Sequence, residues 1–132
     1  MGKSKMKPGG GYMQRRILVV DDDSMNLVRT KMILGKYYDV LLAESGKEAL
    51  QKLESEKIDM VLLDIEMPEM NGMEVFERMK QRGIDIPVIF LTASGDEDDV
   101  KSAIKLGAVN YLKKPFLPPE LMKRVAQELG KE

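Results

Sequence analysis

The sequence predicts an α/β fold, a doubly wound five-stranded parallel sheet in the strand order 2-1-3-4-5 with five helices. Two observations predict it. Short apolar runs alternate with segments of helical periodicity along most of the chain, and right-handed crossovers make this topology the simplest one. In addition, the run Ile17–Val20 ends at Asp21-Asp22-Asp23, and the run Met60–Leu63 ends at Asp64. Because parallel strands end at the same edge of a sheet, these acids are expected to lie together.

The five strands are expected where short apolar runs are bounded by charged or turn-forming residues. Their expected ranges are 16–21, 38–43, 58–63, 87–92 and 109–113. The fourth run ends at Thr92, and the fifth run leads into Lys113, Lys114 and Pro115. Four strands therefore deliver polar side chains of different chemistry to one edge of the predicted sheet.

The five helices are expected between and after these strands. Their expected ranges are 24–36, 46–56, 72–82, 96–107 and 118–130. Ser24 and Ser45 are the predicted N-caps of the first two helices, because their hydroxyl groups can accept from free amide protons. Val100 and Ile104 recur at helical spacing in the fourth helix, and Pro118 opens the fifth at a position where a missing amide proton costs little.

Length and charge indicate one domain with a distinct N-terminal tail. The 132-residue chain is long enough to bury a full core. Residues 1–14 lack periodicity and include Gly9-Gly10-Gly11, so they are expected to be a disordered tail or a cloning remnant, with the domain over 15–132. The net charge is −1, but residues 1–16 carry five basic and no acidic residues, which leaves an acidic body. Direct nucleic-acid binding is therefore not expected.

Several kinds of chemistry are excluded by composition. The chain has no cysteine, so it has no disulfides and no thiolate metal site, and it has no histidine, so imidazole catalysis is absent. No apolar run is long enough to cross a bilayer, and no apolar segment of a signal peptide follows the basic start. These features predict a cytoplasmic protein without a membrane association.

The residues at the strand ends suit a phosphoryl group together with a divalent cation. Two carboxylates about 4 Å apart repel each other by roughly 4 kcal/mol at an effective dielectric constant of 20, and a cation would remove that cost. Mg2+ prefers carboxylates and water, whereas lysine and threonine can stabilise phosphoryl oxygens. Taken singly, each residue has a plainer interpretation: Asp21, Asp22 and Asp23 as helix caps, Thr92 as a strand-end cap and Lys114 as a solvated lysine.

Taken together, the motifs resemble the receiver domain of two-component response regulators, the CheY-like members of the flavodoxin-like folds. The resemblance extends from about Ile17 to Leu129. It is carried by Val19-Val20-Asp21-Asp22, Leu63-Asp64-Ile65-Glu66-Met67-Pro68, Asn71-Gly72, Leu91-Thr92-Ala93 and Lys114-Pro115-Phe116. Five motifs in the family's order make agreement by chance very improbable.

The resemblance implies a phosphoacceptor and a metal site. Asp64 would be the phosphoacceptor. Asp22 and Asp64 would bind Mg2+ directly, with Mn2+ as an alternative, and the backbone carbonyl of Glu66 would complete the protein ligands. Asp21 would act mostly through water.

The resemblance also implies residues that contact the phosphoryl group and residues that influence how long it stays bound. Thr92 and Lys114 would contact the phosphoryl group, with a cis peptide bond at Pro115. Tyr111 would occupy the aromatic switch position, although a packed aromatic residue is an equal alternative there. The side chains of Glu66 and Ser94, which flank the path of an attacking water, would influence the lifetime of the acyl phosphate.

The function implied is that of a signalling switch rather than of a classical enzyme. A sensor histidine kinase or a histidine phosphotransfer protein would donate the phosphoryl group, since this chain has no histidine of its own. The chain would catalyse its own phosphorylation and dephosphorylation. The face formed by helix 4, strand 5 and helix 5 would then bind a downstream protein or an output domain.

Three other functions share some of these features. A flavodoxin-like electron carrier needs a phosphate-binding first loop, and three aspartates there would repel a phosphate. A phosphatase of the haloacid-dehalogenase type needs a second aspartate two residues after its nucleophile, where this chain has Glu66. A receiver-like binding module without phosphorylation usually lacks part of the acidic set, which is complete here.

Overall fold

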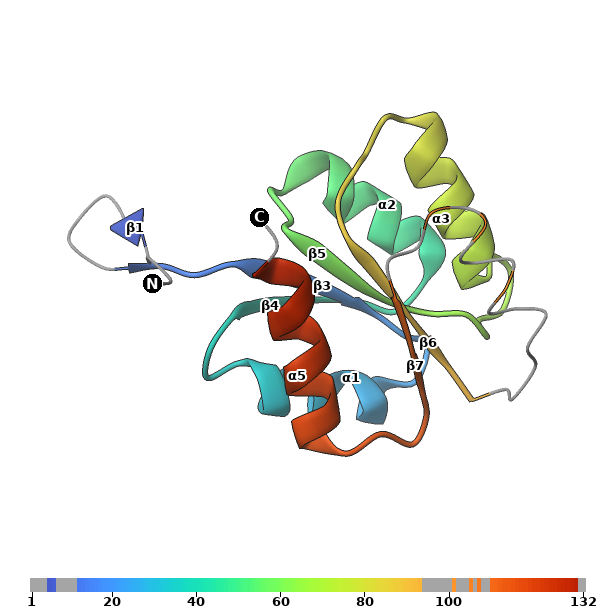
Figure 1. Cartoon of the computed structure of the whole chain (residues 1–132). Coiled ribbons are helices and arrows are strands. Elements are labelled where there is room, and N and C mark those ends of the chain that lie inside the picture. Colours follow the sequence, from blue (N-terminus) through green and yellow to red (C-terminus); the bar gives the residue numbers. More distant parts are fainter. Residues whose placement is uncertain are drawn as a thin grey trace.

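The computed structural model describes residues 5–6, 12–93, 101, 105, 107 and 110–130. Its main sheet has five parallel strands in the order β4-β3-β5-β6-β7 (Figure 1). Their bounds are β3 Arg16–Val20, β4 Asp39–Ala43, β5 Met60–Asp64, β6 Val88–Thr92 and β7 Asn110–Lys113. In chain order these are strands 2-1-3-4-5, so the predicted sheet topology is confirmed.

Four helices are present in the described part of the chain. They are α1 Ser24–Leu34, α2 Gly46–Ser55, α3 Gly72–Gln81 and α5 Pro118–Leu129. The remaining predicted helix, over 96–107, lies largely outside the described residues, and only Lys101 and Lys105 of it are seen in helical backbone. Helices α2 and α3 cover one face of the sheet, and α1 and α5 cover the other (Figure 1).

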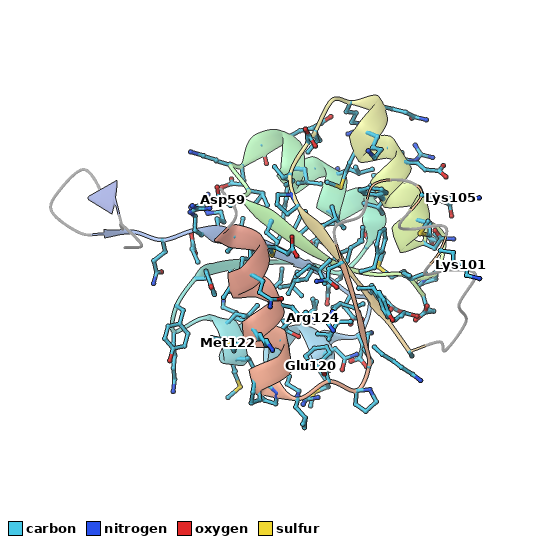
Figure 2. The ribbon with its side chains drawn as sticks, viewed as in Figure 1. Asp59, Lys101, Lys105, Glu120, Met122 and Arg124 are labelled. Atoms are coloured by element: carbon cyan, nitrogen blue, oxygen red, sulfur yellow. The ribbon has the colours of Figure 1, made fainter. Side chains whose placement is uncertain are left out.

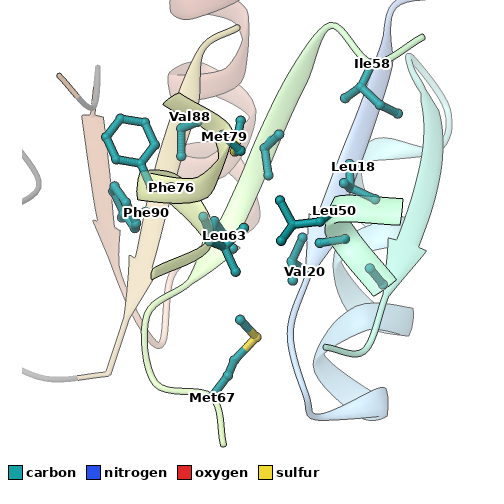
Figure 3. Packing of buried hydrophobic residues seen from close by; sticks show 14 of the residues in the cluster. Leu18, Val20, Leu50, Ile58, Leu63, Met67, Phe76, Met79, Val88 and Phe90 are labelled. Carbon is teal, nitrogen blue, oxygen red and sulfur yellow. The ribbon is translucent and has the colours of Figure 1, made fainter. Parts of the chain in front are cut away.

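Alternating residues of the buried strands form a separate core on each face. Leu18, Val20 and Leu63 belong to the core beneath α2 and α3, where the rings of Phe76 and Phe90 meet edge to face with centroids 5.4 Å apart (Figure 3). Ile17, Val19 and Leu62 belong to the core beneath α1 and α5. Because both faces are covered, the central strands are apolar from Ile17, Met60 and Val88 up to the edge that carries the acids.

At the start of α1 the prediction of Ser24 as the N-cap is wrong, whereas the plainer interpretation of Asp23 as a helix cap is confirmed. Asp23, not Ser24, is the N-cap, because its backbone is extended and its carboxylate accepts from the amides of Met25 and Asn26 at 2.9 and 3.4 Å. A carboxylate here also interacts favourably with the positive end of the helix dipole. At α2 the predicted cap is confirmed, since the Ser45 hydroxyl accepts from the amide of Glu48 at 3.1 Å.

We therefore expect Asp23→Ala to lower the free energy of unfolding by about 1 kcal/mol, the usual cost of losing an N-cap. The neighbouring variant Ser24→Ala should change it by less than about 0.5 kcal/mol, because it leaves the cap in place. Urea unfolding of both variants checks this difference. Equal losses in the two variants would contradict the assignment.

The tail predicted over 1–14 contains two described strands of two residues each. β1, Lys5–Met6, pairs antiparallel with β2, Tyr12–Met13.

Among the described helices, none combines the length and apolar character that a membrane span requires.

Candidate functional site at the carboxyl ends of the strands

Three carboxylates gather where β3 and β5 end. Val20 of β3 is aligned with Leu63 of β5, so Asp21 and Asp22 follow β3 beside Asp64, the last residue of β5. One carboxylate oxygen from each of the three aspartates lies within 4.8 Å of the others. Asp21 and Asp64 are buried, each 2% exposed, whereas Asp22 is open to solvent. The predicted clustering of these acids is thus present.

Lys114 joins the two buried carboxylates. Its Nζ lies 3.1 Å from Oδ2 of Asp21 and 3.2 Å from Oδ2 of Asp64, and its side chain is only 18% exposed. The Lys114–Pro115 peptide bond that follows is cis, as the resemblance implies. One ammonium group therefore pairs with two buried carboxylates and leaves part of their negative charge unbalanced.

Burial and neighbouring charges shift the pKa values of two groups in this cluster, Asp64 and Lys114. Burial raises the pKa of Asp64 to about 7, aided by the negative charges of Asp21 and Glu66 and opposed by the ammonium of Lys114. Burial alone would lower the pKa of Lys114, but the hydrogen bond and charge of Asp21, together with those of Asp64, outweigh it and raise that pKa. The lysine thus stays charged, while Asp64 holds its proton more tightly than an exposed aspartate does.

The chemistry of the cluster fits a hard divalent cation. Its donors are all carboxylate oxygens, the ligands that Mg2+ prefers, and the exposed Asp22 leaves the cluster open to hydrated ions. A dication would offset the negative charge that Lys114 leaves unbalanced. Within the described part of the chain, no second group of three such side chains is found.

A contact absent from the predictions connects Glu66 to the end of β6. The buried Thr92 hydroxyl donates to Oε2 of Glu66 at 2.8 Å, and the backbone N–H of Ala93 donates to Oε1 at 2.9 Å. The amide of Glu66 in turn donates to Oδ1 of Asp64 at 3.3 Å. The sequence features that could have indicated this contact are the acid two residues after Asp64 and the hydroxyl at the end of a neighbouring strand. Ser94 lies outside the described residues.

Gly72 lets α3 begin directly against the backbone of Asp64. A Cβ atom at this position would overlap the carbonyl oxygen of Asp64 and would lie 2.9 Å from Cα of Ile65. The Gly72 amide donates to the carbonyl of Ile65 at 2.9 Å, and a capping box between Asn71 and Glu74 starts the helix. The start of α3 is thus packed directly against the backbone of the strand end that carries Asp64.

We expect Gly72→Ala to lower the free energy of unfolding by about 2 kcal/mol, because backbone atoms must move to admit the methyl group. It should also weaken Mg2+ binding several-fold, since Asp64 moves with that backbone. Asn71→Ala is the control, because it removes the capping box at a cost of about 1 kcal/mol but leaves Gly72 packed. Calorimetric Mg2+ titration should show near-parental affinity for the control, and equal loss in both variants would contradict the prediction.

A pocket of about 280 Å³ opens next to Asp21 and Lys114, between α1 and the segment after β7, and Arg29 and Phe116 line it.

Tyr111 is 39% exposed on β7, so it is not a packed core residue. Its carbonyl accepts from Arg124 of α5 at 2.7 Å, and Figure 2 shows Arg124 beside β7.

The sequence and the structure match one family throughout. The profile of the response regulator receiver domain matches residues 17–126. The chain is 40% identical over 114 residues to the alkaline phosphatase synthesis transcriptional regulatory protein PhoP of Bacillus subtilis, covering 86% of this chain and 48% of that protein. It is 43% identical over 115 residues to the transcriptional regulatory protein CrdR of Helicobacter pylori, covering 86% and 54%. The chain thus spans about half the length of these relatives.

Solved structures give the same result. A CheY-like response regulator receiver domain protein from Methanospirillum hungatei superposes with a TM-score of 0.84 at 32% identity, over 89% of this chain and 95% of that one. The receiver domain of a Luxo repressor protein from Vibrio parahaemolyticus superposes with a TM-score of 0.86 at 31% identity, over 90% and 92%. The chain belongs to the response regulator receiver domain family of two-component signalling.

Proposed function

We propose that the domain accepts a phosphoryl group on Asp64 and signals through the change that this modification causes. The observation that carries the proposal is the pairing of Asp64 with Lys114 at 3.2 Å, beside Asp21 and Asp22. An acceptor carboxylate needs a nearby cation to receive a phosphoryl group of like charge, and Lys114 provides one at the acceptor itself.

In the proposed reaction, an Asp64 oxygen attacks the phosphorus of a phosphohistidine on a sensor kinase or a phosphotransfer protein. The new O–P bond forms as the P–N bond breaks, and the electron pair remains on the imidazole nitrogen. The Lys114 ammonium then forms an ion pair with a phosphoryl oxygen in place of the free carboxylate. The Thr92 hydroxyl donates a hydrogen bond to a second phosphoryl oxygen. Attack requires the ionised carboxylate, so a pKa of about 7 leaves a substantial reactive fraction at neutral pH.

The residues that would hold Mg2+ are Asp22, Asp64 and the carbonyl of Glu66, with Asp21 acting through water. When bound, Mg2+, or Mn2+ in its place, supplies positive charge against the transferring group. The carboxylate cluster supports this assignment because it contains only hard oxygen donors.

The output signal would arise from movements of residues at the carboxyl ends of β6 and β7. Phosphorylation adds nearly two negative charges, and Thr92 and Lys114 are the donors that can bond the new oxygens. Because Thr92 ends β6 and Lys114 directly follows the neighbouring strand β7, their movement would shift Tyr111 and the face that β7 and α5 would form with the predicted helix over 96–107. A downstream protein or an output domain would bind that face, and the site of action would be the cytoplasm.

Side chains near the acceptor would adjust how long the signal lasts. Glu66 and Ser94 would flank the water that attacks the acyl phosphate, and Glu66 adds a negative charge that opposes a nucleophile of like charge. We expect Glu66→Gln to change the rate of dephosphorylation. This rate is measured by mass spectrometry as the decrease of the phosphorylated species over time. An unchanged rate would refute this role.

The test is phosphorylation by a small phosphodonor, such as phosphoramidate, with Mg2+, detected by intact-protein mass spectrometry. One phosphoryl group should be added to the parent chain, and none to Asp64→Asn. Asp59→Asn serves as the matched control, because Asp59 precedes the same strand at its opposite end. Equal labelling of Asp64→Asn would refute the proposal, and steady phosphate release from many phosphomonoesters would favour a phosphatase.

A further inference from the structure

The carboxylate of Glu66 occupies a two-point anion cradle at the end of β6. Its two oxygens each accept from a different donor, the Thr92 hydroxyl at 2.8 Å and the Ala93 amide at 2.9 Å. Hydrogen bonds to an ionised acceptor are stronger than those between neutral groups. The cradle is therefore occupied by an anion that belongs to the chain itself.

The same cradle lies beside the proposed phosphoacceptor. The Glu66 amide donates to Oδ1 of Asp64 at 3.3 Å, which keeps the loop after β5 next to the acceptor. A phosphoryl group on Asp64 presents anionic oxygens with the same need for donors as a carboxylate. The hydroxyl and the amide each have a single hydrogen to donate, so two anions compete for them.

We propose that the Glu66 carboxylate is an internal occupant of the phosphoryl-oxygen site, and that a phosphoryl group on Asp64 must displace it. This inference rests on the proposed function, because it assigns a competitor to the same site. Glu66 therefore determines how readily the site accepts an incoming tetrahedral anion. On phosphorylation the Thr92 hydroxyl therefore exchanges the Glu66 carboxylate for a phosphoryl oxygen as its acceptor.

Exposure determines which group moves. Glu66 is open to solvent, so its carboxylate can leave the cradle and be hydrated. Thr92 is 1% exposed and held at the end of a central strand, so its hydroxyl remains to meet the new oxygen. The negative charge of Glu66 also acts on Asp64, whose pKa it helps to raise. Departure of Glu66 therefore removes both a competitor and a repulsive charge.

Beryllofluoride with Mg2+ is the probe, and isothermal titration calorimetry is the measurement. Glu66→Ala, which empties the cradle, should bind the probe about tenfold more tightly than the parent, the change that corresponds to roughly one charge-assisted hydrogen bond. Glu66→Gln should also gain affinity, because it removes the charge. Glu69→Gln is the matched control, since it removes the same charge from an exposed position of the same loop and leaves Glu66 in place. Its affinity should stay within about twofold of the parental value.

A second readout follows the cradle directly. In metal-free protein, the amide resonance of Ala93 should shift in Glu66→Ala and stay unchanged in Glu69→Gln. If the parent binds beryllofluoride and Asp64→Asn does not, but Glu66→Ala gains no affinity, the inference is overturned and the proposed function stands. If the parent does not bind the probe, both are overturned.

Discussion

We expect Lys114→Met to lower the free energy of unfolding by about 3 kcal/mol at about pH 8 without divalent cation. The variant keeps the aliphatic bulk of the side chain but removes the ammonium group that lies 3.1 Å from Asp21 and 3.2 Å from Asp64. Both carboxylates are buried, so neither can regain full hydration when its partner is lost. The cost is therefore that of buried unpaired charge, which is much larger than the loss of a surface ion pair.

Two controls separate this effect from a general loss of positive charge. Lys113→Met changes the neighbouring exposed lysine and should alter stability by less than about 0.5 kcal/mol. The double variant Lys114→Met with Asp64→Asn should recover a large part of the loss, because it also removes one buried charge. Urea unfolding measures all three variants. A loss below about 1 kcal/mol for Lys114→Met would mean that water already solvates the two carboxylates.

The sheet order and the acidic cluster were predictable because they follow from patterns that cover many residues. Apolar runs of strand length, joined by helical segments, leave few topologies once crossovers are right-handed. Parallel strands then bring Asp21 and Asp64 to one edge without any knowledge of the loops. The lysine after β7 reaches that edge for the same reason.

Details that depend on one side chain or one residue of register were not predictable. Ser24 and Asp23 are both good caps, and only the backbone conformation at Asp23 selects it. The contact of Glu66 with Thr92 depends on how the loop after β5 turns, which no periodic pattern records. The pairing of Lys114 with both carboxylates likewise depends on burial at the site, whereas the resemblance suggested only its contact with a phosphoryl oxygen.

We expect the apparent affinity for Mg2+ to fall about a hundredfold between about pH 8 and about pH 5. In the metal-free protein the pKa of Asp64 is raised to about 7, chiefly by burial. A carboxylate ligand must lose its proton to bind the metal, so each pH unit below the pKa weakens binding about tenfold. An exposed pair of ordinary aspartates would show almost no change over this range, because both would remain ionised.

The stability of the metal-free protein should depend on pH in the opposite direction, because Asp64 lowers it as the pH rises. The folded pKa of Asp64 lies above its ordinary value of 3.8, so folding favours the protonated acid, and this stabilisation is lost as pH rises from 3.8 through about 7. Asp64→Asn mimics the protonated acid and should therefore be more stable than the parent at about pH 8, with the difference vanishing near pH 4. Saturating Mg2+ should reverse the order, because it stabilises the parent through the ionised ligand. A parental Mg2+ affinity that is flat with pH would show that Asp64 is already ionised below neutrality.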